Sequence, residues 1–234
     1  MRRLRILLAG WLLLLAAASW PAQARAQDSG VSFQVTPVFG STYRPGYWLP
    51  LRVLLTNNGT DRTLELRAGS FSTRLEVPGG GRKETILYVF LERTARLRVT
   101  LRDGEAELGT QLIDLNPTSK PVLGALRTQA LPRLADYAVV AAQAPTMPTT
   151  SVGLDTLSAL LVDEQGWRAL APQQTAAIES WVAQGGTLIA EGGAANLLPA
   201  SLRPATAGAA QSNDGAALSA LVAAAERPAA FDAA

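Results

Sequence analysis

Three carboxylates stand where short apolar segments of the sequence end. Asp163 and Glu164 follow the run Leu157–Val162, and Glu191 follows Thr187–Ala190. If both runs are parallel strands, their carboxyl ends meet at one edge of a sheet, where open α/β sheets bind ligands. Carboxylate oxygens at that edge could hold Mg²⁺ or Ca²⁺. The alternative is structural, because acidic residues also cap helices and face solvent at loop edges.

Aromatic residues form a second candidate site. Tyr43, Tyr47 and Trp48 surround Arg44-Pro45-Gly46, a predicted loop. Exposed aromatic side chains can stack on sugar rings or anchor a protein partner, which would make these three residues a binding site. The alternative is that Tyr47 and Trp48 begin a strand and fill the end of a hydrophobic core.

Composition excludes several classes of chemistry. The 234 residues contain no cysteine and no histidine, which excludes Ser-His-Asp and Cys-His catalysis and the usual ligand sets of zinc, copper and haem. Four of the 21 basic residues and none of the 19 acidic residues lie in residues 1–26, so the remainder carries 17 basic and 19 acidic residues. We see no clustered basic face and expect neither a nucleic-acid partner nor a cofactor.

The first 26 residues have the parts of a secretory signal peptide. Arginines in the first five residues precede the uncharged apolar run Ile6–Ser19, and Ala24-Arg25-Ala26 follows. A helix over that run covers about 21 Å, less than the roughly 30 Å of a bilayer core. We expect cleavage before Gln27 and an exported protein that is periplasmic, envelope-associated or extracellular, with an uncleaved anchor as the alternative.

Residues 27–116 alternate apolar and polar side chains, as Leu49, Leu51, Val53 and Leu55 illustrate. Such alternation predicts strands with one buried face. Three segments with turn chemistry separate the runs, namely Asn57-Asn58-Gly59, Gly79-Gly80-Gly81 and Asp103-Gly104. We predict roughly seven short strands in an all-β sandwich that resembles the Ig-like domains preceding other modules in bacterial envelope proteins.

The pattern changes after a predicted linker at residues 117–121. Within residues 122–193, short apolar runs predict the strands of a parallel sheet, with helices between them. The apolar runs are Val122–Leu126, Ala138–Ala142, Leu157–Val162 and Thr187–Ala190. Pro172–Gln184 is the most convincing helix, because proline suits the first helical position and Gly185-Gly186 suits a left-handed C-cap. A weaker helix is predicted over Gln129–Asp136.

The stretch from Leu157 to Gly193 resembles the class I glutamine amidotransferase-like domain found, without its catalytic residues, in bacterial envelope proteins. The shared features are a strand ending in acids, a Leu-x-Pro-x-Gln helix start, Trp-Val-x-x-Gly-Gly, and a strand running into Gly-Gly. The resemblance implies a partial α/β domain with a flavodoxin-like parallel sheet. Active members carry a cysteine on a tight turn and a later histidine. The comparable turn here, Glu191-Gly192-Gly193-Ala194, has no nucleophile, so the resemblance implies the fold without the activity.

The sequence therefore predicts a non-enzymatic envelope or secreted protein that acts as a binding or assembly module. Its expected partner is an envelope protein or a glycan. The alternative is a divalent-metal-assisted hydrolase of cell-wall or glycan material that uses Asp163, Glu164 and Glu191. Residues 194–234 are rich in alanine and predict a low-complexity tail. Because this tail does not supply the further strands of the resembled domain, we expect a truncated chain, with a reduced domain as the alternative. Membrane contact is expected only through the leader or a missing C-terminal anchor.

Overall fold

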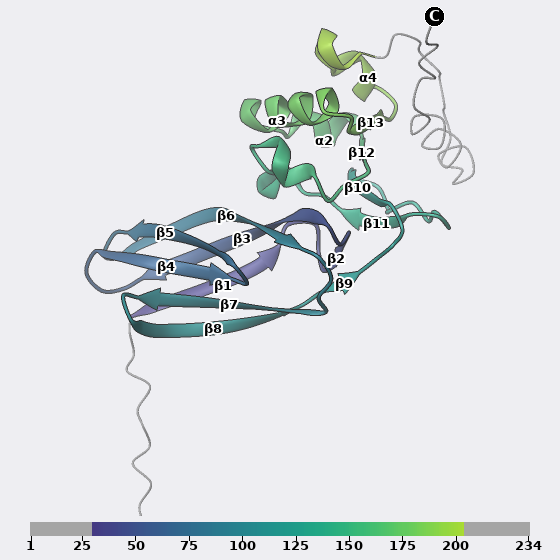
Figure 1. Cartoon of the computed structure of the whole chain (residues 1–234). Coiled ribbons are helices and arrows are strands. Elements are labelled where there is room, and N and C mark those ends of the chain that lie inside the picture. Colours follow the sequence, from purple (N-terminus) through teal and green to yellow (C-terminus); the bar gives the residue numbers. More distant parts are fainter. Residues whose placement is uncertain (1–29, 204–234) are drawn as a thin grey trace, which may run out of the picture. The chain divides into compact units, whose positions relative to one another are not determined.

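The computed structural model describes residues 30–203. The predicted leader and residues 204–234 of the predicted tail lie outside the described residues. From Val31 onward the described residues belong to one compact unit, which is mostly β-strand with a few helices (Figure 1). None of the described helices is both long and apolar enough to cross a membrane.

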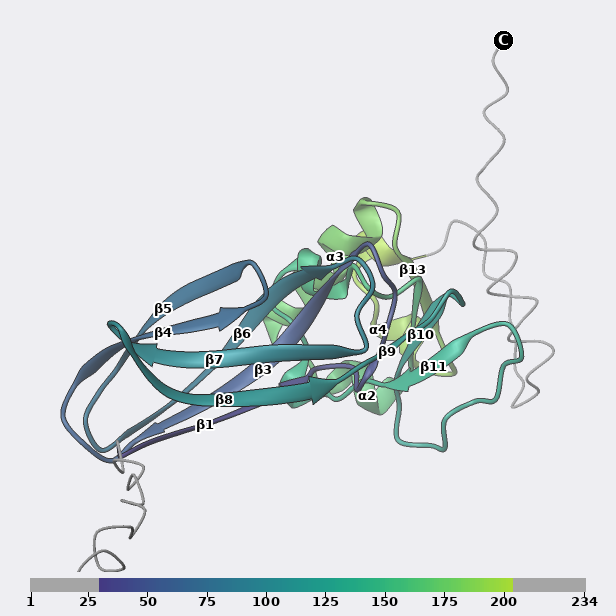
Figure 2. The same ribbon diagram turned by 60° about the horizontal axis from the view of Figure 1, so that its bottom comes forward.

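Two antiparallel sheets make up the first part of this unit. One sheet has the strand order β1-β3-β6, and the other has the order β5-β4-β7-β8 (Figure 2). The strands of the first sheet are β1 (Val31–Pro37), β3 (Tyr47–Asn57) and β6 (Gly81–Leu91). Those of the second are β4 (Arg62–Ala68), β5 (Phe71–Val77), β7 (Arg96–Asp103) and β8 (Ala106–Asp114).

The predicted alternation is confirmed in these strands. Leu49, Leu51, Val53 and Leu55 of β3 are all buried, whereas Arg52 and Leu54 are partly exposed. Buried residues of all seven strands join one hydrophobic core, so the two sheets pack face to face. We call residues 31–115 the sandwich.

Two of the three predicted turns contain a glycine in the left-handed region. Gly80 has φ 65°, and Gly104 has φ 57° in the hairpin between β7 and β8. Asn57-Asn58-Gly59 differs, because no described residue other than glycine has a positive φ and Gly59 is not among those glycines. Here the chain crosses from one sheet to the other. The buried Asn57 side chain holds the crossing, since its Nδ2 donates to the carbonyls of Thr60 (2.6 Å) and Val77 (3.2 Å).

A four-stranded parallel sheet makes up the second part, as the sequence predicted. Its strand order is β11-β10-β12-β13. The strands are β10 (Val122–Leu126), β11 (Ala138–Ala141), β12 (Ala159–Val162) and β13 (Thr187–Ala190). The two central strands are buried along their whole length, which explains why they lack alternation. We call residues 122–203 the parallel-sheet part.

Helix α3 (Pro172–Ala183) matches the predicted helix closely. Proline occupies its first turn, and its end is a Schellman motif in which the Gly186 and Gly185 N–H groups donate to the carbonyls of Trp181 and Val182. Gly185 has φ 99°, which favours glycine there. The buried face of the helix contains Ile178 and Trp181.

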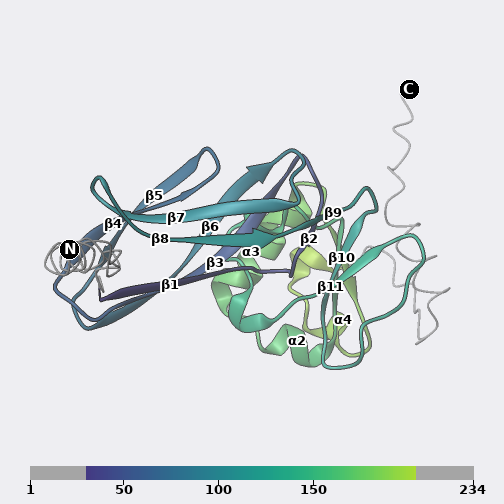
Figure 3. The same ribbon diagram turned by 90° about the horizontal axis from the view of Figure 1, so that it is seen from below.

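The remaining helices are short. They are α2 (Glu164–Arg168) and α4 (Ala194–Leu197), with the 3₁₀ turns η1 (Ala144–Thr146), η2 (Ser151–Leu154) and η3 (Ala200–Leu202). Helices α2, α3 and α4 lie together beside the sheet (Figure 3). The predicted helix over Gln129–Asp136 is wrong, because that segment has no regular structure. Pro132 disfavours the helical conformation at Leu131 before it.

The two parts are tied together near the predicted linker. Strand β9 (Asn116–Pro117) pairs in parallel with β2 (Thr42–Tyr43), and the Thr118 N–H donates to the Tyr43 carbonyl at 2.9 Å. Phe39, which follows β1, is 1% exposed and belongs to the core of the parallel-sheet part. The linker segment is therefore anchored at its start, and the sandwich contributes a side chain to the second core.

Candidate functional site

A cleft of about 1050 Å³ lies between the sandwich and the parallel-sheet part. Its walls come from four segments that are far apart in the sequence: the β2–β3 loop with the start of β3, the linker at residues 119–121, η2 with the residues after it, and the end of α3 with the start of β13. The side chains that give it chemical character are Arg44, Tyr47, Trp48, Ser151, Asp155, Ser158, Trp181 and Gln184. The cleft thus combines aromatic and polar groups.

Arg44 lies on the sandwich side of the cleft and is held by hydrogen bonds to residues of the parallel-sheet part. Its N–H donates to Thr156 Oγ1 (3.3 Å), and its Nη1 donates to Ser158 Oγ (2.8 Å). Its Nη2 donates to the Tyr47 hydroxyl (2.7 Å), and the guanidinium carbon lies 3.9 Å from the centroid of the Tyr47 ring. This cation–π contact and the hydrogen bonds hold both side chains in one arrangement.

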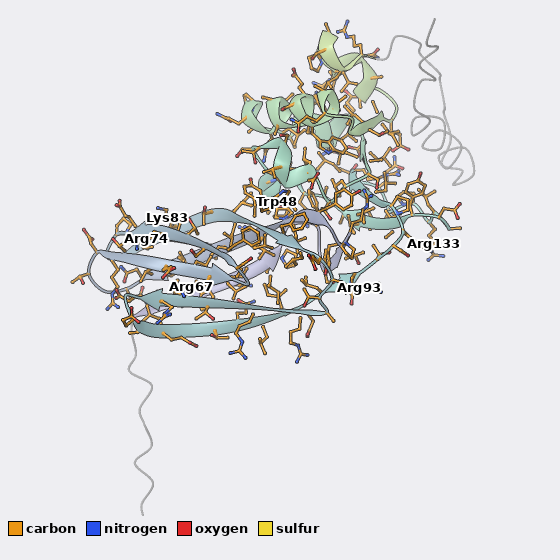
Figure 4. The ribbon with its side chains drawn as sticks, in the orientation of Figure 1. Trp48, Arg67, Arg74, Lys83, Arg93 and Arg133 are labelled. Carbon is orange, nitrogen blue, oxygen red and sulfur yellow. The ribbon has the colours of Figure 1, made fainter. Side chains whose placement is uncertain are left out.

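Trp48 stands beside this pair at the start of β3. Its backbone N–H donates to Asp155 Oδ2 at 3.1 Å, which links the strand to the end of η2. Its ring meets Phe71 edge-to-face at a centroid distance of 5.2 Å, and Phe90 at 5.6 Å. Trp48 lies on the side of the sandwich nearest the helices and is partly exposed (Figure 4).

The opposite wall is the C-terminal end of α3. Exposed Gln184 donates from Nε2 to Ser151 Oγ (3.1 Å) and Ser180 Oγ (3.0 Å). The Trp181 ring covers Gly186 so closely that a Cβ there would lie 2.3 Å from Trp181 Cδ2. Gly186 is therefore needed for the close approach of ring and backbone.

The three predicted aromatic residues have different roles. Tyr47 and Trp48 line the cleft, as the binding interpretation requires. Tyr43 is fully buried, and its hydroxyl accepts from the Thr94 N–H (2.8 Å) and donates to the Thr94 carbonyl (3.0 Å). For Tyr43 the binding interpretation is wrong, because its ring fills the sandwich core and its hydroxyl is already paired.

The three predicted carboxylates have structural partners. Asp163 caps α2, with Oδ1 accepting from the Gly166 N–H (2.6 Å) and Oδ2 accepting from the N–H and hydroxyl of Thr128 (2.8 and 3.0 Å). Glu164 pairs with Arg168 at 2.8 Å. Burial disfavours the charged form of Asp163, but the hydrogen bonds from Thr128 and Gly166, with nearby Arg127, outweigh it and keep the pKa of Asp163 below its usual value.

Glu191 pairs with Arg127, whose side chain is 6% exposed. Their closest atoms, Arg127 Nη2 and Glu191 Oε2, lie 3.4 Å apart, and this contact lacks hydrogen-bond geometry. Within residues 30–203, no group of three or more Asp, Glu, His or Cys side chains is placed to hold a metal ion. The predicted metal site at Asp163, Glu164 and Glu191 is therefore not assembled among the described residues.

Several cleft residues had no signal in the sequence. Arg44 was noted only as part of a loop, and Trp181 only as the tryptophan of the Trp-Val-x-x-Gly-Gly pattern. Asp155 and Gln184 belong to no motif, and they reach the cleft because the fold brings them to residues more than 100 positions away. Such long-range contacts leave no local pattern in one sequence.

Comparisons with known proteins give limited information. A family model described as a domain of unknown function (DUF8726) matches residues 30–116, which coincides with the sandwich and is less than half of the chain. No curated protein matches the chain.

Solved structures give only weak likenesses. The alkylpurine DNA glycosylase AlkC of Pseudomonas fluorescens has 13% identity and a TM-score of 0.28, covering 38% of this chain and 31% of its own. A cycloisomaltooligosaccharide glucanotransferase of Paenibacillus sp. has 12% identity and a TM-score of 0.30, with coverages of 68% and 27%. A carbohydrate acetylesterase of Xanthomonas citri has 7% identity and a TM-score of 0.33, with coverages of 68% and 60%. This chain spans at most 60% of these proteins, and the TM-scores are too low to support an argument.

Proposed function

We propose that this chain is an exported, non-enzymatic protein of the cell envelope that acts as a binding or assembly module. The binding surface in this proposal is the cleft between the sandwich and the parallel-sheet part. The observation that carries the proposal is the composition of that cleft, in which the partly exposed rings of Tyr47 and Trp48 stand beside hydrogen-bonding groups.

The strand order supports the domain types proposed for this chain. Seven antiparallel strands divide into sheets of three and four, with the chain crossing between sheets after β3, β5 and β6, as expected for an Ig-like sandwich at residues 27–116. Numbered in chain order, the parallel strands follow 2-1-3-4, the order with which flavodoxin-like sheets begin. This order supports an amidotransferase-like domain over residues 122–193.

The proposal of a non-enzymatic role rests on the residues available for chemistry. The resembled enzymes require a cysteine and a histidine, and the chain contains neither. The carboxylates at the carboxyl ends of β12 and β13 are engaged by Gly166, Thr128, Arg168 and Arg127. No observation favours the metal-assisted hydrolase over the binding module.

A sedimentation experiment tests this function. The exported protein is incubated with isolated envelopes of the producing bacterium, and the bound fraction is measured alongside the soluble products released. We expect the wild type to sediment with envelopes and to release no cleaved material. Trp48→Ala should lower the bound fraction, because Trp48 is a partly exposed aromatic residue that lines the cleft.

Leu112→Ala is the matched control, since Leu112 is 51% exposed on β8 and does not line the cleft. This variant should bind like the wild type. Wild-type protein that stays in the supernatant, or that releases cell-wall fragments, would refute the proposed function.

A further inference from the structure

We propose that the ligand of the cleft is a short neutral oligosaccharide. This inference rests on the proposed function and adds the chemical class of the ligand. Three properties of the cleft support it: its charge, its aromatic surface and its set of hydrogen-bonding groups.

The charge of the cleft favours a neutral ligand. Among its described lining residues there is one cation, Arg44, and one anion, Asp155. Both already have partners, since Arg44 donates to Ser158 and Tyr47 and Asp155 accepts from the Trp48 N–H. A phosphate or polyanion would require several unpaired cations, which this lining lacks.

The aromatic surface favours a ligand with flat apolar faces. Trp48 is partly exposed, and Phe71 and Phe90 contact its ring in edge-to-face geometry. A side chain fixed in this way loses little freedom when a ligand stacks on it. The carbon faces of pyranose rings are apolar while their edges carry hydroxyl groups, so one sugar ring can contact Trp48 and hydrogen-bond to its surroundings.

The hydrogen-bonding groups of the cleft favour a ligand that carries many hydroxyl groups. Ser151, Ser158 and Thr187 supply hydroxyls, and exposed Gln184 supplies an amide that donates and accepts. These polar groups and Trp48 line the same cleft. A volume of about 1050 Å³ is at the upper end of ligand pockets, which suits more than one sugar ring.

A proline-rich peptide is the competing ligand, because aromatic grooves also bind polyproline helices. Such peptides present few donors, since proline lacks an N–H. Ser151 and Ser158 already accept hydrogen bonds from Gln184 and Arg44. A polyproline peptide would offer no N–H to an acceptor such as Gln184 Oε1, at a cost in affinity. The polar walls therefore favour the saccharide.

Titration calorimetry with defined probes tests the inference. The probes are cellotetraose, maltotetraose and chitotetraose, with decaproline and inorganic phosphate as competing ligand classes. We expect wild-type protein to bind at least one of the three tetrasaccharides and neither of the other probes. Trp48→Ala should weaken that binding by roughly tenfold, as expected for the loss of one stacking contact.

Two further variants keep the test independent of folding. Trp48→Phe retains an aromatic ring and should recover part of the affinity. Gln184→Ala on the opposite wall should weaken binding without altering the aromatic cluster. Leu112→Ala should bind like the wild type.

Three results would overturn the inference: no tetrasaccharide binds, decaproline or phosphate binds instead, or the Trp48 and Gln184 variants bind a tetrasaccharide like the wild type. Failure here is distinguishable from failure of the proposed function. If envelopes bind the protein in a Trp48-dependent manner while no tetrasaccharide does, the cleft is a binding surface for another ligand class.

Discussion

At the scale of single residues, the contacts and exposure of polar side chains separate structural residues from candidate binding residues. Asp163 is structural, because both of its carboxylate oxygens accept hydrogen bonds that hold α2 and the loop after β10. Gln184 is a candidate binding residue in the proposed function, since it is exposed and lines the cleft. Residue type alone does not make this distinction.

Asp163→Ala should destabilise the protein in a pH-dependent manner. The variant loses a helix N-cap, so we expect a decrease of about 1–2 kcal/mol in the free energy of unfolding at pH 7. The pKa of Asp163 is lowered in the folded state from its ordinary value of 3.8. Its stabilising contribution is therefore complete above that ordinary value and is lost as the pH falls through the lower folded value.

Urea unfolding of wild type and variant at a series of pH values measures this difference. The two free energies of unfolding should converge at acidic pH, below the ordinary pKa of the carboxyl. Asp136→Ala, at an exposed position, is the control and should follow the wild type throughout. A difference between Asp163→Ala and wild type that does not change with pH would show that the carboxylate charge is not involved.

At the scale of elements, helix α3 depends on one buried amide. Gln174 is 7% exposed, and its Nε2 donates to the carbonyls of Ala144 (2.7 Å) and Met147 (2.9 Å). Its Oε1 accepts from the Ala171 N–H (2.8 Å) at the helix start. These hydrogen bonds give a structural reason for the glutamine two positions after the proline in the Leu-x-Pro-x-Gln pattern.

Gln174→Ala should therefore lower the free energy of unfolding by about 2–3 kcal/mol, because it leaves buried carbonyls without a donor. The neighbouring Gln173 is exposed on the same helix, so Gln173→Ala should change stability by no more than about 0.5 kcal/mol. Thermal and urea denaturation of the pair provides the comparison. Equal stability of the two variants would mean that the Gln174 hydrogen bonds do not contribute.

The helices and strands also show which features could be predicted from the sequence alone. Helix α3, the strands of the sandwich and the four parallel strands follow local patterns, and their existence was predicted correctly. The crossing at Asn57 was not predicted, because Asn-Gly segments occur in hairpins as well. The far wall of the cleft was not predicted either. Asp155 and Gln184 line the same cleft as Trp48 only because of how the sandwich and the parallel-sheet part are arranged.

At the scale of the whole molecule, the proposed export would determine where a ligand is found. The predicted leader lies outside the described residues, so cleavage before Gln27 remains a prediction from the sequence. Expression in a secreting bacterial host should yield exported protein that begins at Gln27, because Ala24-Arg25-Ala26 offers small residues to the signal peptidase. Intact-mass analysis measures this, and retention of residues 1–26 would contradict it.

The central claim is that the cleft between the sandwich and the parallel-sheet part contacts an envelope component. Site-specific photo-crosslinking tests it most directly, with benzoylphenylalanine introduced at Gln184 on the cleft wall and, as a control, at exposed Leu112 on β8. After illumination of cells that export the full chain, we expect adducts in the envelope fraction from position 184, fewer when Trp48→Ala is added, and none from position 112. No adduct from position 184, or equal adducts from both positions, would contradict the claim that this cleft is the binding surface.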